Sequence, residues 1–300
     1  MKRSDRPVLV TGASGYVGRA LVPHLRNAGI PVRALVRDAK KGRRLMDSGA
    51  ELQVGDLLDP PTLARSVRGC SAVIHLAAIA YSSDVALNRR VNVEGSRNLA
   101  KACRDAGVAR VINFSSTCAG RSQQDAYGRS KREAEAEFEG PEVTHLRPTM
   151  IYGRGSEEFE RFARIVAAAP RVPIPGDGKS ILQPVALDDL LALVGRVLNS
   201  PNTIGKTYDV AGPVPIGVDH LVEATARAQG KTAKVVHIPG ALCLFGARVL
   251  GRLLPHPPIN VDQVLAFLQD THVDIGPARR DLAFDPRPLE EGLAEVLGVP

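Results

Sequence analysis

Short apolar runs alternate with helical segments through the first half of this sequence, and no other feature restricts its fold as much. The run Ala72–Leu76 is apolar at nearly every position, which is typical of a parallel strand buried on both faces. Alternating strands and helices predict a parallel sheet covered by helices. We predict strands at Val8–Val10, Val32–Val36, Leu52–Val54, Ala72–Leu76, Val111–Phe114, Val143–Leu146 and Thr207–Val210, and helices at Tyr16–Ala28, Pro61–Val67, Val91–Ala106, Tyr127–Glu139 and Asp188–Leu198.

The composition of the sequence changes after Tyr152, where proline and glycine become frequent and the predicted helices and strands become irregular. A chain of 300 residues is long enough for one such sheet and a smaller appended lobe. We therefore predict an α/β fold with a doubly wound parallel sheet in residues 1–150, to which residues 183–211 return. Residues 151–182 and 212–300 are expected to form a small C-terminal substrate lobe.

Composition argues against nucleic-acid binding. The net charge of +7 is compatible with a polyanionic partner, but the sequence has no Trp, only 4% aromatic residues and no long basic run. Stacking platforms for single strands need aromatic side chains, so we expect no nucleic-acid partner. A phosphate-bearing small molecule explains the positive charge more simply.

Cysteine and histidine usage argues against a metal site and for a cytoplasmic location. The four cysteines are widely spaced, form no metal-type pairs, and are expected to be reduced thiols. The first strand is predicted to begin by Val8, which leaves no room for a signal peptide. No apolar run approaches the roughly 18 residues that span a bilayer.

A glycine-rich turn, Thr11–Gly18, follows the first predicted strand. Glycines three residues apart allow a tight turn and a close approach of the backbone to a pyrophosphate, and the next helix offers its N-terminal amide groups to the phosphates. This strand–turn–helix context predicts a dinucleotide cofactor bound to a sheet of the Rossmann type. The contacts expected from this turn are made by Gly12, Ser14, Gly15, Tyr16, Val17 and Gly18.

The end of the second strand predicts which dinucleotide is bound. NAD enzymes usually place a carboxylate there to hold the ribose 2′-hydroxyl, whereas this sequence has Arg37. A guanidinium binds a 2′-phosphate in a fork, so we predict NADP(H). NAD(H) stays an alternative because Asp38 follows directly. The basic residues Lys40, Lys41, Arg43 and Arg44 either extend the phosphate site or form the solvent-exposed face of a surface helix.

Tyr127 and Lys131 are four residues apart at the start of a predicted helix and therefore share a face. A phenol with a pKa near 10 is a poor base at neutral pH, and a neighbouring ammonium lowers that value. Hydroxyl side chains at Ser115–Thr117 follow the fifth strand, at the sheet edge where ligands bind in such folds. The set predicts a proton-transfer site.

The sequence resembles the extended short-chain dehydrogenase/reductase family, which includes NAD-dependent epimerases and dehydratases, over essentially its whole length. Its tail, including Ile181–Val185 and Gly205–Tyr208, also resembles the branch related to the NADPH-binding accessory subunit of respiratory complex I. The matching segments are Thr11–Gly18, Asp56-Leu57, His75–Ala78, Asn92–Gly95, Ser115–Thr117, Tyr127–Lys131, and Leu146-Arg147-Pro148 through Tyr152-Gly153.

The resemblance implies a role for each matching residue. Thr117 aligns with the catalytic hydroxyl, with Ser116 in reserve, and Tyr127 and Lys131 complete the catalytic set. The resemblance also implies further contacts with the cofactor. Asp56 and Leu57 would hold the adenine, Leu76, Ala77 and Ala78 would line the path of the cofactor, and Pro148 would pack near the nicotinamide. Asn92 would support the site, and Ser115 is a further expected contact.

These features favour an NADP(H)-dependent oxidoreductase that acts on a secondary alcohol or ketone as its small-molecule substrate. A nucleotide-sugar epimerase or dehydratase is the first alternative, although Thr117 and Tyr127 are only ten residues apart, closer than is usual in such members. A non-catalytic NADPH-binding assembly or sensor protein is the second. The intact Thr, Tyr and Lys set favours an enzyme over this last reading.

The apolar segment Ala241–Leu254 carries two arginines four residues apart. It suits a helix buried in the smaller lobe, which we favour, or a helix that rests on a membrane surface. A homodimer is also left open.

Overall fold

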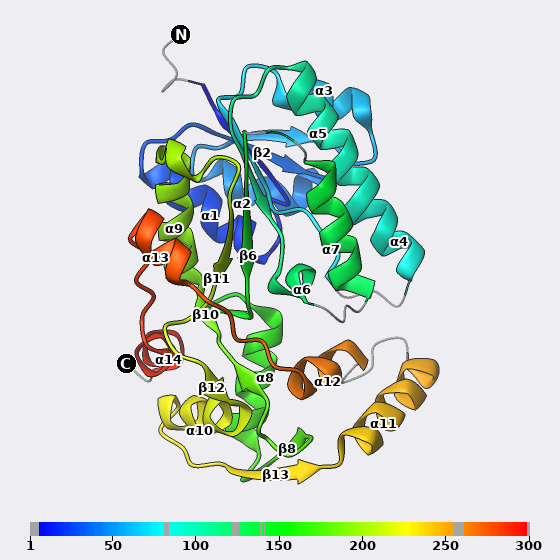
Figure 1. Cartoon of the computed structure of the whole chain (residues 1–300), viewed down its shortest axis with the longest axis vertical. Coiled ribbons are helices and arrows are strands. Elements are labelled where there is room, and N and C mark those ends of the chain that lie inside the picture. Colours follow the sequence, from blue (N-terminus) through cyan, green and yellow to red (C-terminus); the bar gives the residue numbers. More distant parts are fainter. Residues whose placement is uncertain are drawn as a thin grey trace. The chain divides into compact units, whose positions relative to one another are not determined.

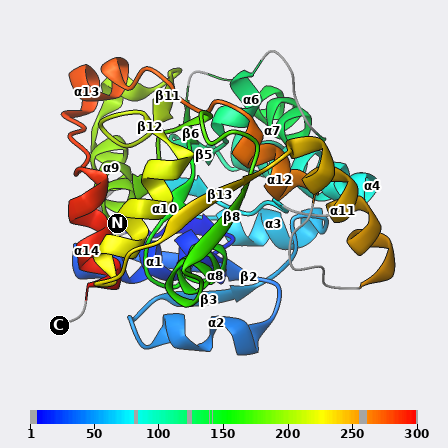
Figure 2. The same ribbon diagram turned by 90° about the horizontal axis from the view of Figure 1, so that it is seen from below.

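The computed structural model describes residues 6–80, 84–121, 126–138, 140, 142–254 and 261–298 (Figures 1 and 2). The chain divides into two compact units. Unit 1 consists of Met1–Pro148, Leu190–Val210 and Ile275–Phe284, and unit 2 of Thr149–Asp189, Ala211–Asp274 and Asp285–Pro300.

Unit 1 is built on a seven-stranded sheet in the order β11-β6-β5-β4-β1-β2-β3, in which every neighbouring pair is parallel. The predicted doubly wound parallel sheet is confirmed, and its order of strands is the one expected of a Rossmann sheet. The strands are β1 (Val8–Thr11), β2 (Val32–Val36), β3 (Glu51–Val54), β4 (Ala72–His75), β5 (Val111–Phe114), β6 (Val143–Pro148) and β11 (Thr207–Val210).

Helices cover both faces of this sheet. Figure 1 shows α3, α5 and α7 on one face and α1 and α9 on the other. The helices of unit 1 are α1 (Tyr16–Asn27), α2 (Ala39–Met46), α3 (Pro60–Val67), α4 (Val85–Arg89), α5 (Gly95–Asp105), α6 (Thr117–Gly120), α7 (Ala126–Glu137), α9 (Leu187–Asn199) and α13 (Gly276–Leu282), with a short 3-10 helix at Pro201–Thr203.

Aspartates begin three of these helices. The side chains of Asp38, Asp59 and Asp84 accept hydrogen bonds from backbone N–H groups in the first turns of α2, α3 and α4. A carboxylate at this position satisfies a donor that has no partner within the helix and complements the positive end of the helix dipole.

The core of unit 1 lies between the sheet and the helices. Leu9, Val73 and Val111 from the strands pack in one buried cluster with Leu63 of α3 and Leu99 of α5. These apolar side chains are removed from water between the sheet and the helices of one of its faces, and such burial is the main favourable contribution to folding.

The expected helix at Val91–Ala106 is interrupted. A single π-helical turn, Arg90–Glu94, joins α4 to α5 and shifts the backbone hydrogen-bond pattern by one residue. Such turns occur mostly inside α-helices and frequently at functional sites. Here the turn contains Asn92, whose side chain is described below.

Unit 2 surrounds a second core that includes Tyr152, Phe159, Val222 and Leu293. Its strands pair as β10 with β7 and β13 with β8 in parallel, and as β12 with β9 in the antiparallel sense. Its elements are β7 (Ile151–Tyr152), α8 (Glu157–Ala168), β8 (Arg171–Pro175), β9 (Ile181–Leu182), β10 (Val185–Ala186), β12 (Ile216–Gly217), α10 (Val218–Ala228), β13 (Lys234–Ile238), α11 (Gly240–Leu253), α12 (Val261–Leu268) and α14 (Leu289–Leu297).

Residues 275–284 belong to unit 1, whereas the sequence analysis assigned the whole of 212–300 to the smaller lobe. The reason is a polar contact between α13 and β11. The Asp281 carboxylate accepts hydrogen bonds from Lys206 Nζ and from Tyr208 Oη, each at 2.7 Å. Within the described residues, no helix is long and apolar enough to cross a bilayer.

Candidate active site

The glycine turn after β1 is shaped by close backbone packing. Gly12 has a φ of +65°, and a Cβ atom on it would lie 2.7 Å from the backbone nitrogen of Ala77. A Cβ atom on Gly18 would overlap Ala13 in the same turn. Glycine is therefore required where the turn meets the chain after β4 and where α1 begins.

The N-terminus of α1 suits an anionic group. Its N-cap residue, Gly15, provides no side-chain cap, and the first turn contains no acidic residue. Gly15 is exposed, while Ser14, Tyr16 and Val17 are half-buried. Amide groups and the positive end of the helix dipole at this glycine cradle fit the pyrophosphate of a dinucleotide.

A chain of hydrogen bonds ties this turn to β4 and α5. The Ala77 N–H donates to Thr11 Oγ1 at 3.3 Å, and Thr11 Oγ1 lies 2.7 Å from His75 Nδ1. His75 Nε2 lies 3.1 Å from Ser96 Oγ, which donates to the Asn92 carbonyl at 2.6 Å. Because Ser96 uses its proton on that carbonyl, the chain assigns the His75 proton to Nε2 and leaves Nδ1 to accept from Thr11.

His75 is neutral within this chain. Burial lowers its pKa to about 3, and the nearby Lys131 ammonium adds to that shift. In the sequence, His75 is recognisable only as part of the His75–Ala78 motif. Its role as a bridge from the glycine turn to α5 depends on partners 21 and 64 residues away, which the sequence alone does not reveal.

Arg37 and Asp38 take different positions at the end of β2. Arg37 is exposed directly after the strand. The Asp38 carboxylate is engaged as the N-cap of α2, where it accepts a hydrogen bond of 2.8 Å from the Lys40 N–H. The basic residues Lys40, Lys41, Arg43 and Arg44 are exposed on the same helix.

The residues after β3 are divided between the surface and the core. Asp56 Oδ1 accepts a hydrogen bond of 2.8 Å from the Leu58 N–H. Leu57 is buried in the core, where a Cβ atom on Gly95 of α5 would touch its side chain. Because β2 and β3 are adjacent and parallel, Arg37 and Asp56 follow neighbouring strand ends.

Asn92 fixes the segment after β4. Its amide oxygen accepts from the Ile79 N–H at 2.8 Å, and its amide nitrogen donates to the Ile79 carbonyl at 3.0 Å. The same nitrogen lies 3.0 Å from Ser130 Oγ in α7. In the segment that Asn92 holds, Leu76 and Ala77 are half-buried and Ala78 is exposed.

Lys131 and Tyr127 lie one turn apart on α7. Lys131 is buried, and its Nζ donates a hydrogen bond of 2.5 Å to the carbonyl oxygen of Phe114 at the end of β5. Burial lowers the pKa of Lys131 to about 8, and the Glu135 carboxylate opposes that shift. Tyr127 is half-buried near the start of the helix.

The candidate hydroxyls follow β5. Ser115 is buried and donates its backbone N–H to the Leu146 carbonyl at 2.7 Å. Ser116 caps α6 by accepting from the Cys118 N–H, and Thr117 is the buried first residue of that helix. Because α6 packs against α7, the fold brings the helix of Thr117 against the helix of Tyr127 and Lys131.

An ion pair beneath Lys131 was not expected from the sequence. Arg147 donates to both oxygens of Glu135, at 2.8 and 2.5 Å, and the Glu135 side chain is 11% exposed. Burial favours the neutral acid, but the hydrogen bonds from Arg147 and Ser115 and the Arg147 charge together outweigh it and lower the pKa of Glu135. Its spacing of four residues from Lys131 was the available sequence signal, because such residues share a helix face.

Arg147 is followed by Pro148, which ends β6. Pro148 is buried and lies opposite Val210 of β11 in the parallel register. It therefore lies at the same carboxyl edge of the sheet as the glycine turn and the segment that begins at Ser115.

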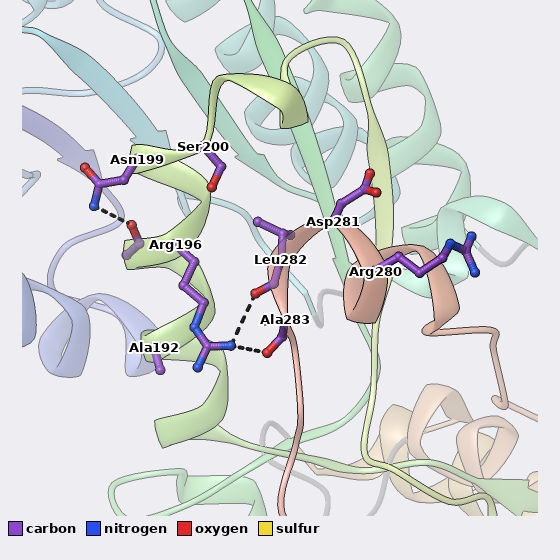
Figure 3. Close-up of a pocket in the computed structure, with 9 residues that line it drawn as sticks. Ala192, Arg196, Asn199, Ser200, Arg280, Asp281, Leu282 and Ala283 are labelled. Carbon is purple, nitrogen blue, oxygen red and sulfur yellow. Dashed lines mark hydrogen bonds between the residues drawn. The ribbon is translucent and has the colours of Figure 1, made fainter.

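A hollow lies between α9 and α13 of unit 1, and its polar side chains are engaged with neighbouring residues (Figure 3). Arg196 donates to the carbonyls of Leu282 and Ala283, and Asn199 donates to the Gly195 carbonyl. Asp281 accepts from Lys206 and from Tyr208 of β11. The fold itself occupies these polar groups, so we assign the hollow no binding role.

Comparison with known proteins gives this geometry a context. The UDP-glucose 4-epimerase of Vibrio cholerae is 27% identical over 98% of this chain and 95% of its own. Mouse mitochondrial NADH dehydrogenase [ubiquinone] 1 alpha subcomplex subunit 9 is 30% identical over 96% of this chain and 78% of its own. The structure of MoeE5 in complex with UDP-glucose and NAD is 24% identical, with a TM-score of 0.76 over 97% of each chain.

Residues 8–211 match the family described as the NAD dependent epimerase/dehydratase family. This match spans more than half of the chain and covers the sheet, the glycine turn and the Tyr127–Lys131 helix. The resemblance seen in the sequence is thereby confirmed, and the chain belongs to the NAD dependent epimerase/dehydratase family.

Proposed function

We propose that this protein is an NADP(H)-dependent oxidoreductase that moves hydride between the nicotinamide and a ketone or secondary alcohol. The observation that carries the proposal is the buried Lys131 ammonium, held at the end of β5 and one helical turn from Tyr127. A buried cation is costly, so its retention beside a phenol indicates a chemical role.

Each residue of the set has a definite task. Tyr127 gives a proton to the substrate oxygen or takes it away, Thr117 donates a hydrogen bond to that oxygen, and Lys131 favours the phenolate through its charge and contacts the ribose. The bound nicotinamide supplies or accepts the hydride. The Glu135–Arg147 pair holds α7 against β6, the contact of Ser130 with Asn92 holds it against the π-helical turn, and both position the set.

The preference for NADP(H) rests on Arg37 and the basic face of α2. Asp38 is engaged in capping that helix, which leaves the exposed Arg37 as the side chain suited to a 2′-phosphate. The glycine cradle of Gly12, Ser14, Gly15 and Gly18, with the N-terminal amides of Tyr16 and Val17, would hold the pyrophosphate. Asp56, Leu57, Leu76, Ala77, Ala78, Ser115 and Pro148 would line the rest of the dinucleotide.

Two other functions have support among the relatives. A relative named UDP-glucose 4-epimerase favours the epimerase alternative, in which hydride returns to the same substrate. The similarity to a complex I subunit favours a non-catalytic NADPH-binding protein. The Thr117, Tyr127 and Lys131 set distinguishes the enzyme from this last alternative, because a purely structural nucleotide site does not need the phenol.

A titration with NADPH and NADH, followed by turnover assays on a panel of ketones, alcohols and UDP-sugars, tests the proposal. We expect tighter binding of NADPH and net oxidation or reduction of at least one carbonyl or alcohol. Interconversion of UDP-sugars without net change of the cofactor would identify an epimerase. NADPH binding with no turnover across the panel would favour the non-catalytic function.

A further inference from the structure

Helix α11 of unit 2 presents an apolar stripe to solvent. The stripe consists of Leu242, Phe245, Val249 and Leu253, which are 60%, 64%, 36% and 72% exposed. Their spacing of three and four residues places them on one face of the helix. The opposite face contains the buried Ala247, and α11 packs beside α12 (Figures 1 and 2).

This arrangement is unusual for a helix at the surface of a compact unit. Single exposed apolar residues are common, but a row of four along most of a 14-residue helix marks an interaction surface. The sequence analysis favoured burial of this segment, and the structure leaves one of its faces in water.

The charged residues of α11 itself have one sign. Arg248 and Arg252 are exposed, and they follow the stripe along one side of the helix. Between Glu223 and Asp262 the sequence contains no acidic residue. The basic residues in that interval are Arg227, Lys231, Lys234, Arg248 and Arg252. The partner of this surface must therefore be apolar and negatively charged at the same time.

We propose that the stripe of α11 inserts into the interfacial layer of an anionic lipid bilayer, with Arg248 and Arg252 on the headgroup phosphates. An apolar face flanked by arginines is the pattern of helices that lie in the membrane plane. The helix is about 21 Å long at 1.5 Å per residue, which is too short to span a bilayer and suits one that lies flat.

A second copy of the chain fits this surface less well. A two-fold dimer places the same patch of both copies in contact, so the arginines would lie beside a partner that presents arginines as well. With no carboxylate near the stripe in sequence, such an interface leaves these charges uncompensated. Anionic lipid supplies the missing charge.

Vesicle flotation tests the proposal with the full chain. We expect co-flotation with vesicles of phosphatidylcholine and 30% phosphatidylglycerol, little with phosphatidylcholine alone, and release at 0.5 M salt. Replacing Arg248 and Arg252 by Ala should weaken binding about fivefold for each arginine. Leu242→Ser with Phe245→Ser should weaken it at least about tenfold.

Matched variants separate insertion from general attraction to a basic protein. Arg104→Ala removes an exposed arginine of α5, and Ile165→Ser removes an exposed apolar side chain of α8. Both should bind vesicles as the wild type does. Circular dichroism and NADPH titration check that every variant is folded. If the controls lose binding as strongly as the α11 variants, the proposal is overturned.

The absence of Trp from the sequence allows a direct probe of insertion. Phe245→Trp should show a blue-shifted emission on anionic vesicles and quenching by brominated lipid, whereas Ile165→Trp should show neither. Unshifted Phe245→Trp emission on saturating vesicles contradicts the proposal. So does a wild type that stays out of the floating fraction, or a dimer in sedimentation that Leu242→Ser with Phe245→Ser dissociates.

Discussion

Lys131 Nζ donates a hydrogen bond of 2.5 Å to the carbonyl oxygen of Phe114, and this contact fixes a buried cation at the end of strand β5. The nearest carboxylate that acts on it, Glu135, is itself committed to Arg147. The site therefore holds Lys131 in a state that is unfavourable for folding and useful for proton transfer, as expected of a functional group.

Replacing Lys131 by Met should stabilise the protein at neutral pH while abolishing turnover. Burial lowers the pKa of Lys131 from 10.5 to about 8, so the folded state binds the proton less well than the unfolded state. We expect the free energy of unfolding to rise by about 1–3 kcal/mol at pH 7. The cost of the buried charge disappears between about pH 8 and 10.5, so the difference between variant and wild type should shrink in that range. Urea unfolding at several pH values measures the difference in the free energy of unfolding between the variant and the wild type. An equal difference at pH 7 and at pH 10.5 contradicts this prediction.

Tyr127→Phe should lower turnover about 10²–10⁴-fold and leave NADPH affinity nearly unchanged, because it removes a proton-transfer group and keeps the ring. Tyr208→Phe is the matched control, since its hydroxyl contacts Asp281 on α13. Steady-state kinetics on the best substrate, with NADPH titration of each variant, is the measurement. Unchanged turnover in Tyr127→Phe would remove Tyr127 from the mechanism.

Thr117→Val should reduce turnover about tenfold and spare nucleotide affinity, because it deletes a single hydrogen bond to the substrate oxygen. The two side chains are similar in size, and Thr117 is buried, so circular dichroism must show that the fold survives. Ser116→Ala tests the reserve hydroxyl in parallel. A larger loss in Ser116→Ala would transfer the role to Ser116.

Arg37→Asp should weaken NADPH binding about 10–100-fold and leave NADH binding equal or stronger, because a carboxylate repels the 2′-phosphate and accepts from a 2′-hydroxyl. Arg104→Asp, an exposed arginine on α5, serves as the control for net charge. Fluorescence titrations with both nucleotides decide the outcome. A wild type that binds NADH at least as well as NADPH would contradict the role of Arg37.

Gly12→Ala should reduce NADPH affinity at least about tenfold, because the new methyl group meets the Ala77 backbone at 2.7 Å and displaces the turn. Gly107→Ala is a close control, since Gly107 has a φ of +63° and nothing within 4 Å of its added Cβ atom. Both variants carry the same backbone strain, so only the clash distinguishes them. Equal affinities in the two variants would show that the close approach is unimportant.

Glu135→Gln should destabilise the protein by about 2 kcal/mol, because it leaves the half-buried Arg147 without its counter-ion. It also removes the carboxylate that opposes the fall in the Lys131 pKa, so the upper limb of the pH–rate profile should move to lower pH. The control is Glu137→Gln. Glu137 lies on the same helix as Glu135, and it forms a more exposed ion pair with Arg97 of α5. A pH profile identical to that of the wild type would exclude a positioning role for Glu135.

Most strands of unit 1 were predictable because they are buried apolar runs between turn residues, whereas β3 contains Glu51 and Gln53 and is not buried. Three of them, β2, β5 and β11, have the bounds expected from the sequence. The glycine turn was predictable for a similar local reason. The strand β6 extends two residues further than expected, through Arg147, because Glu135 from another element neutralises that charge.

The features that escaped prediction depend on partners distant in the sequence. The π turn at Asn92 is held by Ile79 and Ser130, and the neutral His75 by Thr11 and Ser96. The two-residue strands of unit 2, such as β7 and β9, are too short for any periodicity. Their pairing is decided by tertiary packing alone.

The membership of α13 in unit 1 has a consequence for biosynthesis. The chain passes between the units at 148/149, 189/190, 210/211, 274/275 and 284/285. On the ribosome, α13 therefore reaches the sheet only after residues 211–274 of unit 2 have been synthesised, and α14 of unit 2 follows it. The two units are completed almost together, so neither can be excised, exchanged or shed by a single cut in the gene.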